Sequence, residues 1–209
     1  MAKSTYFRHY CFGLLVIIGF GAHGQAVKKA VFPTKPIVTN EAELRRAILD
    51  TGKTQLKLRE RPGAANNNRD PQITVYNRAV GVPDNAFYCA SGGYWCHLVN
   101  GVRLPLSAPA AVRSWFADPK KQVKWQQGQR VQVFDAVSLF RSHVEFVADP
   151  AGFEDEDEEL VQLIGWNTTG GSQKQQGCHL NWRSKSWIKV VANHITPFLK
   201  NQHGTAVKN

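Results

Sequence analysis

The 209-residue chain has only four cysteines, and the first of them, Cys11, lies in an amino-terminal apolar segment. The other three are Cys89, Cys96 and Cys178, an odd number that cannot pair fully within one chain. A disulfide framework is therefore excluded as the main source of stability, and at least one thiol is expected to stay free.

Several functional signatures are also missing from the sequence. It contains no metal-ligand spacing, no glycine-rich loop suited to a phosphate and no nucleotide-binding fingerprint. It has no internal repeat and no long low-complexity tract. We therefore expect chemistry that needs no cofactor and no metal.

Long apolar runs are absent after the amino terminus. Basic residues precede an apolar stretch over residues 11–20, and the small residues Ala22 and Gly24 follow it. This order is typical of a secretory signal peptide, and the run is short for a membrane span. We predict a signal peptide over residues 1–24, a secreted or periplasmic protein and no stable membrane insertion. An uncleaved membrane anchor is the alternative.

The chain is basic, with a formal net charge of +10. Basic proteins bind anionic polymers, of which nucleic acid is the usual one. An exported protein instead meets the carboxylates and acidic polymers of the cell wall. We expect peptidoglycan as the partner, no nucleic acid, and a monomer; generic surface charge that favours solubility is the alternative.

Helix signals come first along the chain. Asn40 and Glu43 have the spacing of a capping box, and Gly52 ends the helix that follows. Asp70 and Pro71 form a typical helix start. The expected helices are residues 40–52, 70–80, 88–100 and 107–117.

Alternating apolar and polar residues follow and indicate strands joined by short loops. The expected strands are residues 130–134, 144–147, 160–166, 178–182 and 187–192. Helices before strands predict an α+β fold in which N-terminal helices pack on an antiparallel sheet.

The expected domain plan has four parts: the signal peptide, a proline-containing linker over residues 25–39, a catalytic domain over residues 40–198 and a flexible tail over residues 199–209. Six consecutive acidic residues, 154–159, are interpreted as a solvated loop.

Cys89 falls in the first turn of an expected helix, where the positive end of the helix dipole favours a thiolate. The competing interpretation is a buried structural cysteine. His143 opens an apolar strand downstream, and the order cysteine then histidine is the one that papain-like enzymes use. Other histidines, at positions 97, 179, 194 and 203, compete by residue type alone.

A set of short motifs resembles the cysteine- and histidine-dependent amidohydrolase/peptidase (CHAP) domain of papain-like peptidoglycan hydrolases. The likeness spans roughly residues 56–195. In chain order the motifs are Leu58-Arg59-Glu60 with Gly63, Asn66-Asn67-Asn68-Arg69, Tyr76, Val80-Gly81, Tyr88-Cys89-Ala90 with Trp95-Cys96, Ser142-His143-Val144 with Phe146-Val147, and Trp166-Asn167-Thr168 with Gly170-Gly171.

The resemblance implies a papain-like fold, Cys89 as nucleophile, His143 as general base and Asn167 as the polar group near the imidazole. The family usually has a glutamate where this chain has Gly165. The imidazole must then be oriented by Asn167, which we expect, or by Glu145, which shares a strand face with His143.

The neighbours of these residues complete the expected site. Tyr88 and Trp166 adjoin it in sequence and are expected to contact substrate. Gly92 and Gly93 weaken the nucleophile helix by about 1 kcal/mol each relative to alanine, which suggests that substrate or a strand approaches there.

These observations predict a secreted cysteine hydrolase that cleaves amide bonds of cell-wall peptide stems, as an endopeptidase or as an amidase at the sugar–peptide junction. Two alternatives remain at this stage: a catalytically silent wall-binding module, which Gly165 supports, and an antibacterial toxin of the same fold.

Overall fold

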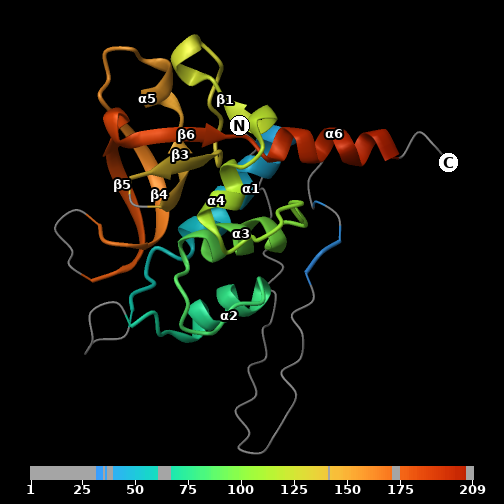
Figure 1. The fold of residues 1–209 in the computed structure, drawn as a ribbon, viewed down its shortest axis with the longest axis vertical. Coiled ribbons are helices and arrows are strands. Elements are labelled where there is room, and N and C mark those ends of the chain that lie inside the picture. The colour runs from blue at the N-terminus through green and yellow to red at the C-terminus, as the bar shows by residue number, and fades with distance from the viewer. Residues whose placement is uncertain are drawn as a thin grey trace, which may run out of the picture. The chain divides into compact units, whose positions relative to one another are not determined.

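Helices and an antiparallel sheet make up the described part of the chain, so the predicted α+β class is confirmed (Figure 1). The computed structural model describes residues 32–34, 36, 40–60, 67–140, 142–170 and 175–205. The predicted signal peptide lies outside the described residues.

The first three helices begin and end close to where the capping signals predict. The Asn40 side chain accepts hydrogen bonds from the backbone N–H groups of Ala42 and Glu43, and that of Asp70 accepts one from Gln72 at 2.8 Å. The helices are α1 (Glu41–Lys53), α2 (Pro71–Ala79), α3 (Cys89–Val99), α4 (Val112–Phe116), α5 (Ala151–Glu154) and α6 (Ile195–Thr205), with 3-10 turns η1 (Pro119–Lys121), η2 (Trp125–Gln127) and η3 (Lys185–Trp187).

The sheet has six strands in the order β1-β6-β2-β3-β4-β5, and all neighbours are antiparallel. The strands are β1 (Gln122–Val123), β2 (Ala136–Leu139), β3 (His143–Asp149), β4 (Leu160–Thr168), β5 (Gly177–Ser184) and β6 (Ile188–Ala192). The central strands β3 and β4 carry most of the candidate site.

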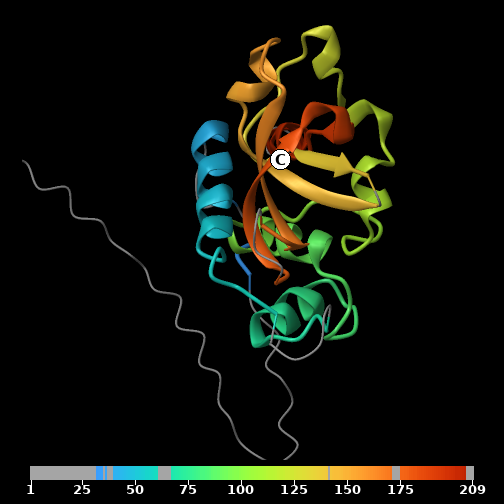
Figure 2. The same cartoon turned by 90° about the vertical axis from the view of Figure 1, so that its left-hand side faces the viewer.

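Two apolar clusters lie on opposite faces of this sheet, because neighbouring residues of a strand point to opposite sides. The larger includes Phe146 and Trp166 together with Leu44 and Ile48 from α1. Figure 2 shows α1, in blue, running beside the sheet. The smaller cluster includes Val147 and its cross-sheet neighbours.

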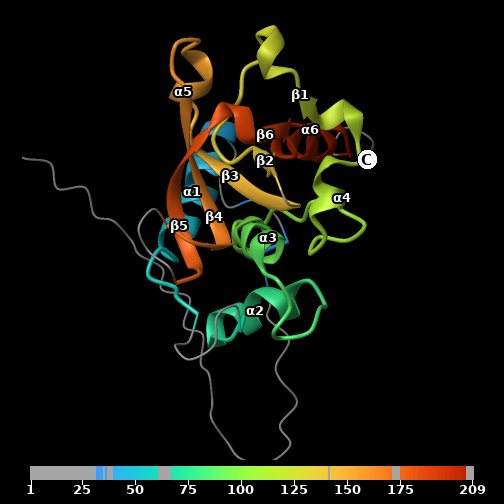
Figure 3. The same cartoon turned by 60° about the vertical axis from the view of Figure 1, so that its left-hand side comes forward.

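Helix α3 lies between α2 and the sheet (Figure 3). A Cβ added to Gly92 would lie 2.4 Å from the Trp166 ring, and one added to Gly93 would lie 2.0 Å from the Phe146 ring. The two glycines therefore let α3 approach β3 and β4 closely. The sequence suggested that either substrate or a strand approaches here, and the structure shows the strands.

The predicted strand at residues 130–134 is wrong, and the strand at this point is β2 instead. A buried ion pair fixes the preceding segment in a turn: Arg45 Nη1 donates to the Val133 carbonyl at 2.7 Å and to Asp135 Oδ1 at 2.9 Å. Phe134 adopts a positive φ of 64°. Alternation of residue types along the sequence does not reveal this long-range pair.

The predicted domain limits also need correction at both ends. Helix α6 crosses the expected start of the tail at residue 199, and Phe198 and Leu199 are each only 8% exposed. In the predicted linker, Phe32 packs against the larger apolar cluster. The folded unit therefore extends beyond residues 40–198 on both sides.

Candidate active site

Cys89 is the first residue of α3 and is 7% exposed. The first backbone N–H groups of a helix have no partner inside the helix. Among the described residues, no side chain caps this helix start. The first-turn N–H groups can therefore bind an anion that forms beside the Cys89 sulfur.

His143 opens β3, and its imidazole lies near enough to the Cys89 thiol for the interaction between them to raise the pKa of His143. The two residues are 54 positions apart in sequence, so the fold alone creates the pair. Their closeness provides a nucleophile with an adjacent base, which is the minimal requirement for covalent catalysis by cysteine.

Glu145 also lies next to the imidazole. Its Oε1 is 3.3 Å from His143 Nε2, within ion-pairing distance, although the angles do not meet those of a hydrogen bond. The pair is therefore electrostatic in this geometry. Glu145 is fully buried and receives two hydrogen bonds from Arg183, at 3.0 Å and 2.6 Å.

These contacts set the charges of the pair. Burial lowers the pKa of His143, but the contacts with Cys89 and Glu145 outweigh burial and raise it to about 9. Burial raises the pKa of Glu145, but the contacts with His143 and Arg183 outweigh that effect and leave the pKa below its usual range. At neutral pH the site therefore holds an imidazolium between a carboxylate and the Cys89 sulfur.

The expected role of Asn167 as the group that orients the imidazole is corrected by its contacts. Its Oδ1 accepts a hydrogen bond from the backbone N–H of Tyr88 at 3.3 Å. Its amide group donates to Glu60 Oε1, Asn68 Oδ1 and Gln176 Oε1 at 2.9–3.2 Å. Asn167 thus fixes the residue before the nucleophile, and a positive φ of 55° places it there.

Tyr88 and Trp166 are both fully buried, so the expectation that they contact substrate is wrong. The Tyr88 hydroxyl donates to buried Glu60 at 3.1 Å, and the Trp166 ring packs on Gly92. Phe87, two residues before Cys89, is 72% exposed instead. The sequence offers one signal for it, an aromatic residue next to the nucleophile motif.

Two of the histidines that competed with His143, His97 and His194, are occupied elsewhere. His97 Nδ1 is 2.9 Å from the Gly93 carbonyl, and burial lowers the pKa of His97 to about 3. His194 Nε2 is 2.7 Å from the Trp115 carbonyl, and burial lowers its pKa to about 4. Neither can serve as a proton donor near neutral pH.

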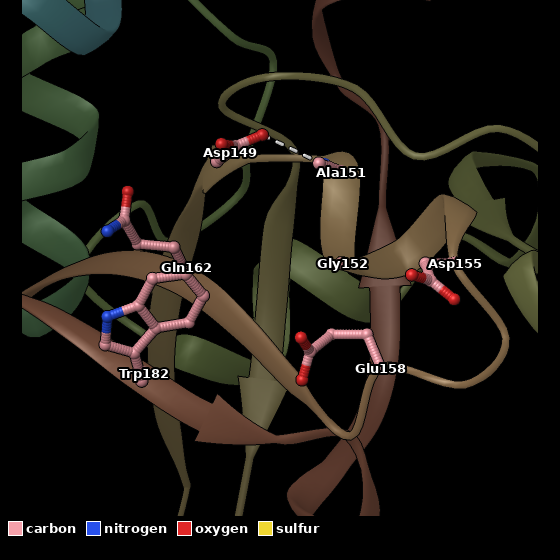
Figure 4. A pocket seen from close by; sticks show the side chains of 7 residues that line it. All are labelled: Asp149, Ala151, Gly152, Asp155, Glu158, Gln162 and Trp182. Atoms are coloured by element: carbon pink, nitrogen blue, oxygen red, sulfur yellow. Dashed lines mark hydrogen bonds between the residues drawn. The ribbon is translucent and has the colours of Figure 1, made fainter.

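A pocket of about 170 Å³ lies at the other end of β3 (Figure 4). Its lining includes the exposed Trp182 and the acidic side chains of Asp149, Asp155 and Glu158. His143 and Asp149 are the two ends of a seven-residue strand, roughly 20 Å apart. The pocket is therefore separate from the Cys89–His143 pair.

Within the described residues, no group of three or more His, Cys, Asp or Glu side chains is arranged to hold a metal ion. No helix of that part of the chain combines the length and hydropathy needed to cross a membrane. The site described above thus rests on Cys89, His143 and Glu145.

Searches against protein-family models, curated proteins and solved structures returned no match for this chain.

Proposed function

We propose that this protein is a papain-like cysteine hydrolase that cleaves amide bonds in the peptide stems of bacterial cell walls. The contact between the Cys89 thiol and the His143 imidazole, with Glu145 behind it, is the observation that carries the proposal. A silent binding module would not need to keep a buried carboxylate beside a histidine and a helix-start cysteine.

The reaction follows from the placement of these groups. The Cys89 thiolate attacks the carbonyl carbon, and the first-turn N–H groups of α3 bind the oxyanion that forms. The carbon–nitrogen bond then breaks, and the His143 imidazolium gives its proton to the departing amine. A thioester remains on Cys89.

Hydrolysis of this thioester completes the cycle. The neutral His143 imidazole removes a proton from a water molecule, which attacks the thioester carbonyl. The carbon–sulfur bond breaks, the carboxylic acid leaves, and the thiolate and imidazolium are restored. The cycle needs no redox partner, since no atom changes oxidation state.

The cell wall is proposed as the substrate because the sequence predicts export and the chain is basic. The exposed Phe87 beside Cys89 offers an apolar contact for a peptide, although burial of Tyr88 and Trp166 leaves few aromatic residues for sugar stacking at this point.

Incubation of the protein with purified peptidoglycan tests the proposed function. We expect soluble products whose masses show hydrolysis of an amide bond. New amino termini with intact lactyl–peptide links would identify an endopeptidase, and free stem peptides an amidase. The Cys89→Ala protein is the matched control. Absence of any amide cleavage by the native protein, with its thermal unfolding intact, would refute the proposal.

The pKa of His143 leads to a prediction on pH. Amine departure needs the protonated imidazole, whose pKa is about 9, so kcat/KM on a soluble stem peptide should decrease as the pH rises through about 9. Circular dichroism over the same range checks that the fold persists. A rate that stays constant to well above pH 10 would contradict the assignment of His143 as the acid.

A further inference from the structure

The Glu145 carboxylate occupies the space directly over Gly165. Strands β3 and β4 are antiparallel, and Phe146 of β3 pairs with Ile164 of β4. Glu145, which precedes Phe146, therefore lies opposite Gly165, which follows Ile164. A Cβ added to Gly165 would lie 2.6 Å from Cγ, 2.7 Å from Cδ and 2.7 Å from Oε1 of Glu145. No side chain can be present at position 165 while Glu145 holds this conformation.

The carboxylate is held there by donors on the far side of β4. Arg183 and Asn181, both on β5, donate to it, and Arg183 Nη2 also donates to Thr168 Oγ1 at 3.0 Å. Because Glu145 stands on β3, its side chain crosses β4 to reach these donors, and Gly165 is the residue that it crosses. The absence of a side chain at Gly165 thus leaves the space in which the Glu145 carboxylate lies beside His143.

A side chain at position 165 could supply the same carboxylate. In glutamate the carboxylate carbon lies two bonds from Cβ, a distance of about 2.5 Å. The Cβ position of residue 165 is 2.7 Å from the carboxylate carbon of Glu145. A glutamate introduced at position 165 can therefore place its carboxylate where Glu145 now has it, between the imidazole and Arg183.

We propose that Glu145 is the positioning residue of His143, and that the site requires a carboxylate at this point in space, which either position 145 or position 165 can supply. The inference rests on the proposed function for its kinetic consequences, but its geometric part concerns only the Cys89–His143 pair. Arg183 compensates the charge of the buried carboxylate, which would otherwise be costly.

The test compares Glu145→Ala with the double variants Glu145→Ala/Gly165→Glu and Glu145→Ala/Gly165→Gln. The first readout is the rate at which iodoacetamide alkylates Cys89 as a function of pH, which needs no substrate. Removing the carboxylate should lower the pKa of His143. The midpoint of the corresponding step in the plot of alkylation rate against pH should therefore fall by about one pH unit or more. The double variant with Gly165→Glu should restore the native profile. The double variant with Gly165→Gln, of nearly equal shape, should not.

The second readout is cleavage of the soluble stem peptide. Loss of the carboxylate should reduce kcat/KM on the order of 10- to 100-fold, less than loss of the acid–base group itself, which is worth about 10²–10⁴-fold. The upper pH limit of activity should fall with it. Restoration to within about threefold by Gly165→Glu, but not by Gly165→Gln, is the expected result.

The outcomes separate this inference from the proposed function. Restored alkylation profiles without any amide cleavage would refute the hydrolase and leave the carboxylate assignment intact. An unchanged pH profile in Glu145→Ala would overturn the assignment even if peptidoglycan is cleaved. Where thermal unfolding shows that Glu145→Ala does not fold, Glu145→Gln keeps the shape and removes the charge; a native pH profile in that variant would equally overturn the assignment.

Discussion

Replacing Cys89 with alanine should abolish amide cleavage and leave the fold intact. Removal of the nucleophile from enzymes of this kind costs several orders of magnitude in rate, and we expect a loss of about 10⁴-fold or more. Cys89 is 7% exposed and belongs to the larger apolar cluster, so the loss of its sulfur should lower the Tm slightly without unfolding the domain. Product release from peptidoglycan, followed by mass spectrometry, measures the first effect, and thermal unfolding the second.

Cys178→Ala is the matched control for this variant. Cys178 is fully buried on β5, and burial raises the pKa of its thiol well above the usual value. Its loss should reduce stability but leave the activity of the folded protein within a few fold of native. Iodoacetamide should modify Cys89 and neither Cys96 nor Cys178, since both of these are fully buried and burial raises the pKa of each thiol. A Cys89→Ala protein that still cleaves peptidoglycan would end the cysteine-hydrolase proposal.

Local signals were sufficient for the first three helices and for placing Cys89 at a helix start and His143 at a strand start, but α4 is shorter than the expected helix over residues 107–117, and α5 and α6 were not predicted. The caps at Asn40 and Asp70 are read from neighbours two or three residues away, so the starts of α1 and α2 follow from the sequence. Cys89 at a helix start and His143 at a strand start follow from the same kind of evidence. The contact between them is then what a packed helix and strand make possible.

The third site residue could not be chosen from the sequence, because it depends on which residues of adjacent strands face each other. The resemblance to the CHAP domain leads to the expectation of a glutamate where this chain has Gly165. In the sheet, the register of β3 and β4 brings Glu145 over that same glycine. Asn167, the expected alternative, makes its hydrogen bonds to the segment before the nucleophile instead.

Nearness in sequence was also a poor guide to exposure. Trp166 adjoins Asn167, an expected site residue, yet its ring is fully buried because strand neighbours point to opposite faces of the sheet. Trp182 lies on β5 and is 60% exposed. Whether a tryptophan is buried or exposed depends on the face of the sheet to which its side chain points. To predict that face, the limits of the strand and the packing of α3 must be known.

That packing leads to the second large expected effect, a loss of stability in Gly93→Ala. Helix propensity alone favours alanine over glycine by about 1 kcal/mol. The new methyl carbon, however, would lie 2.0 Å and 2.1 Å from two carbons of the Phe146 ring. That ring is itself confined: it stacks on Phe134 at a centroid distance of 4.8 Å and meets the edge of Trp115 at 5.1 Å.

Because neither partner of Phe146 leaves room for the ring to move, helix α3 must shift away from β3, and overpacking of this kind costs up to about 3 kcal/mol. The cost exceeds the propensity gain, so we expect a net destabilisation of about 2 kcal/mol and a Tm lower by roughly 4–8 °C for a domain of this size. Thermal unfolding followed by circular dichroism measures it. Ser91→Ala is the control on the same helix: Ser91 is fully buried and its hydroxyl has no partner among the described residues, so its removal should be neutral or slightly stabilising.

The same shift should reach the Cys89–His143 pair, since α3 carries Cys89 at its start and β3 carries His143 at its start. At a temperature where Gly93→Ala is still folded, its kcat/KM should therefore fall by more than the folded fraction explains, because a displacement of the order of 1 Å between reacting groups can cost about 100-fold. A variant with native activity per folded molecule would mean that the helix accommodates the methyl group by moving away from Phe146 without changing the distance between sulfur and imidazole. A higher Tm than native would mean that helix propensity outweighs the contact with Phe146.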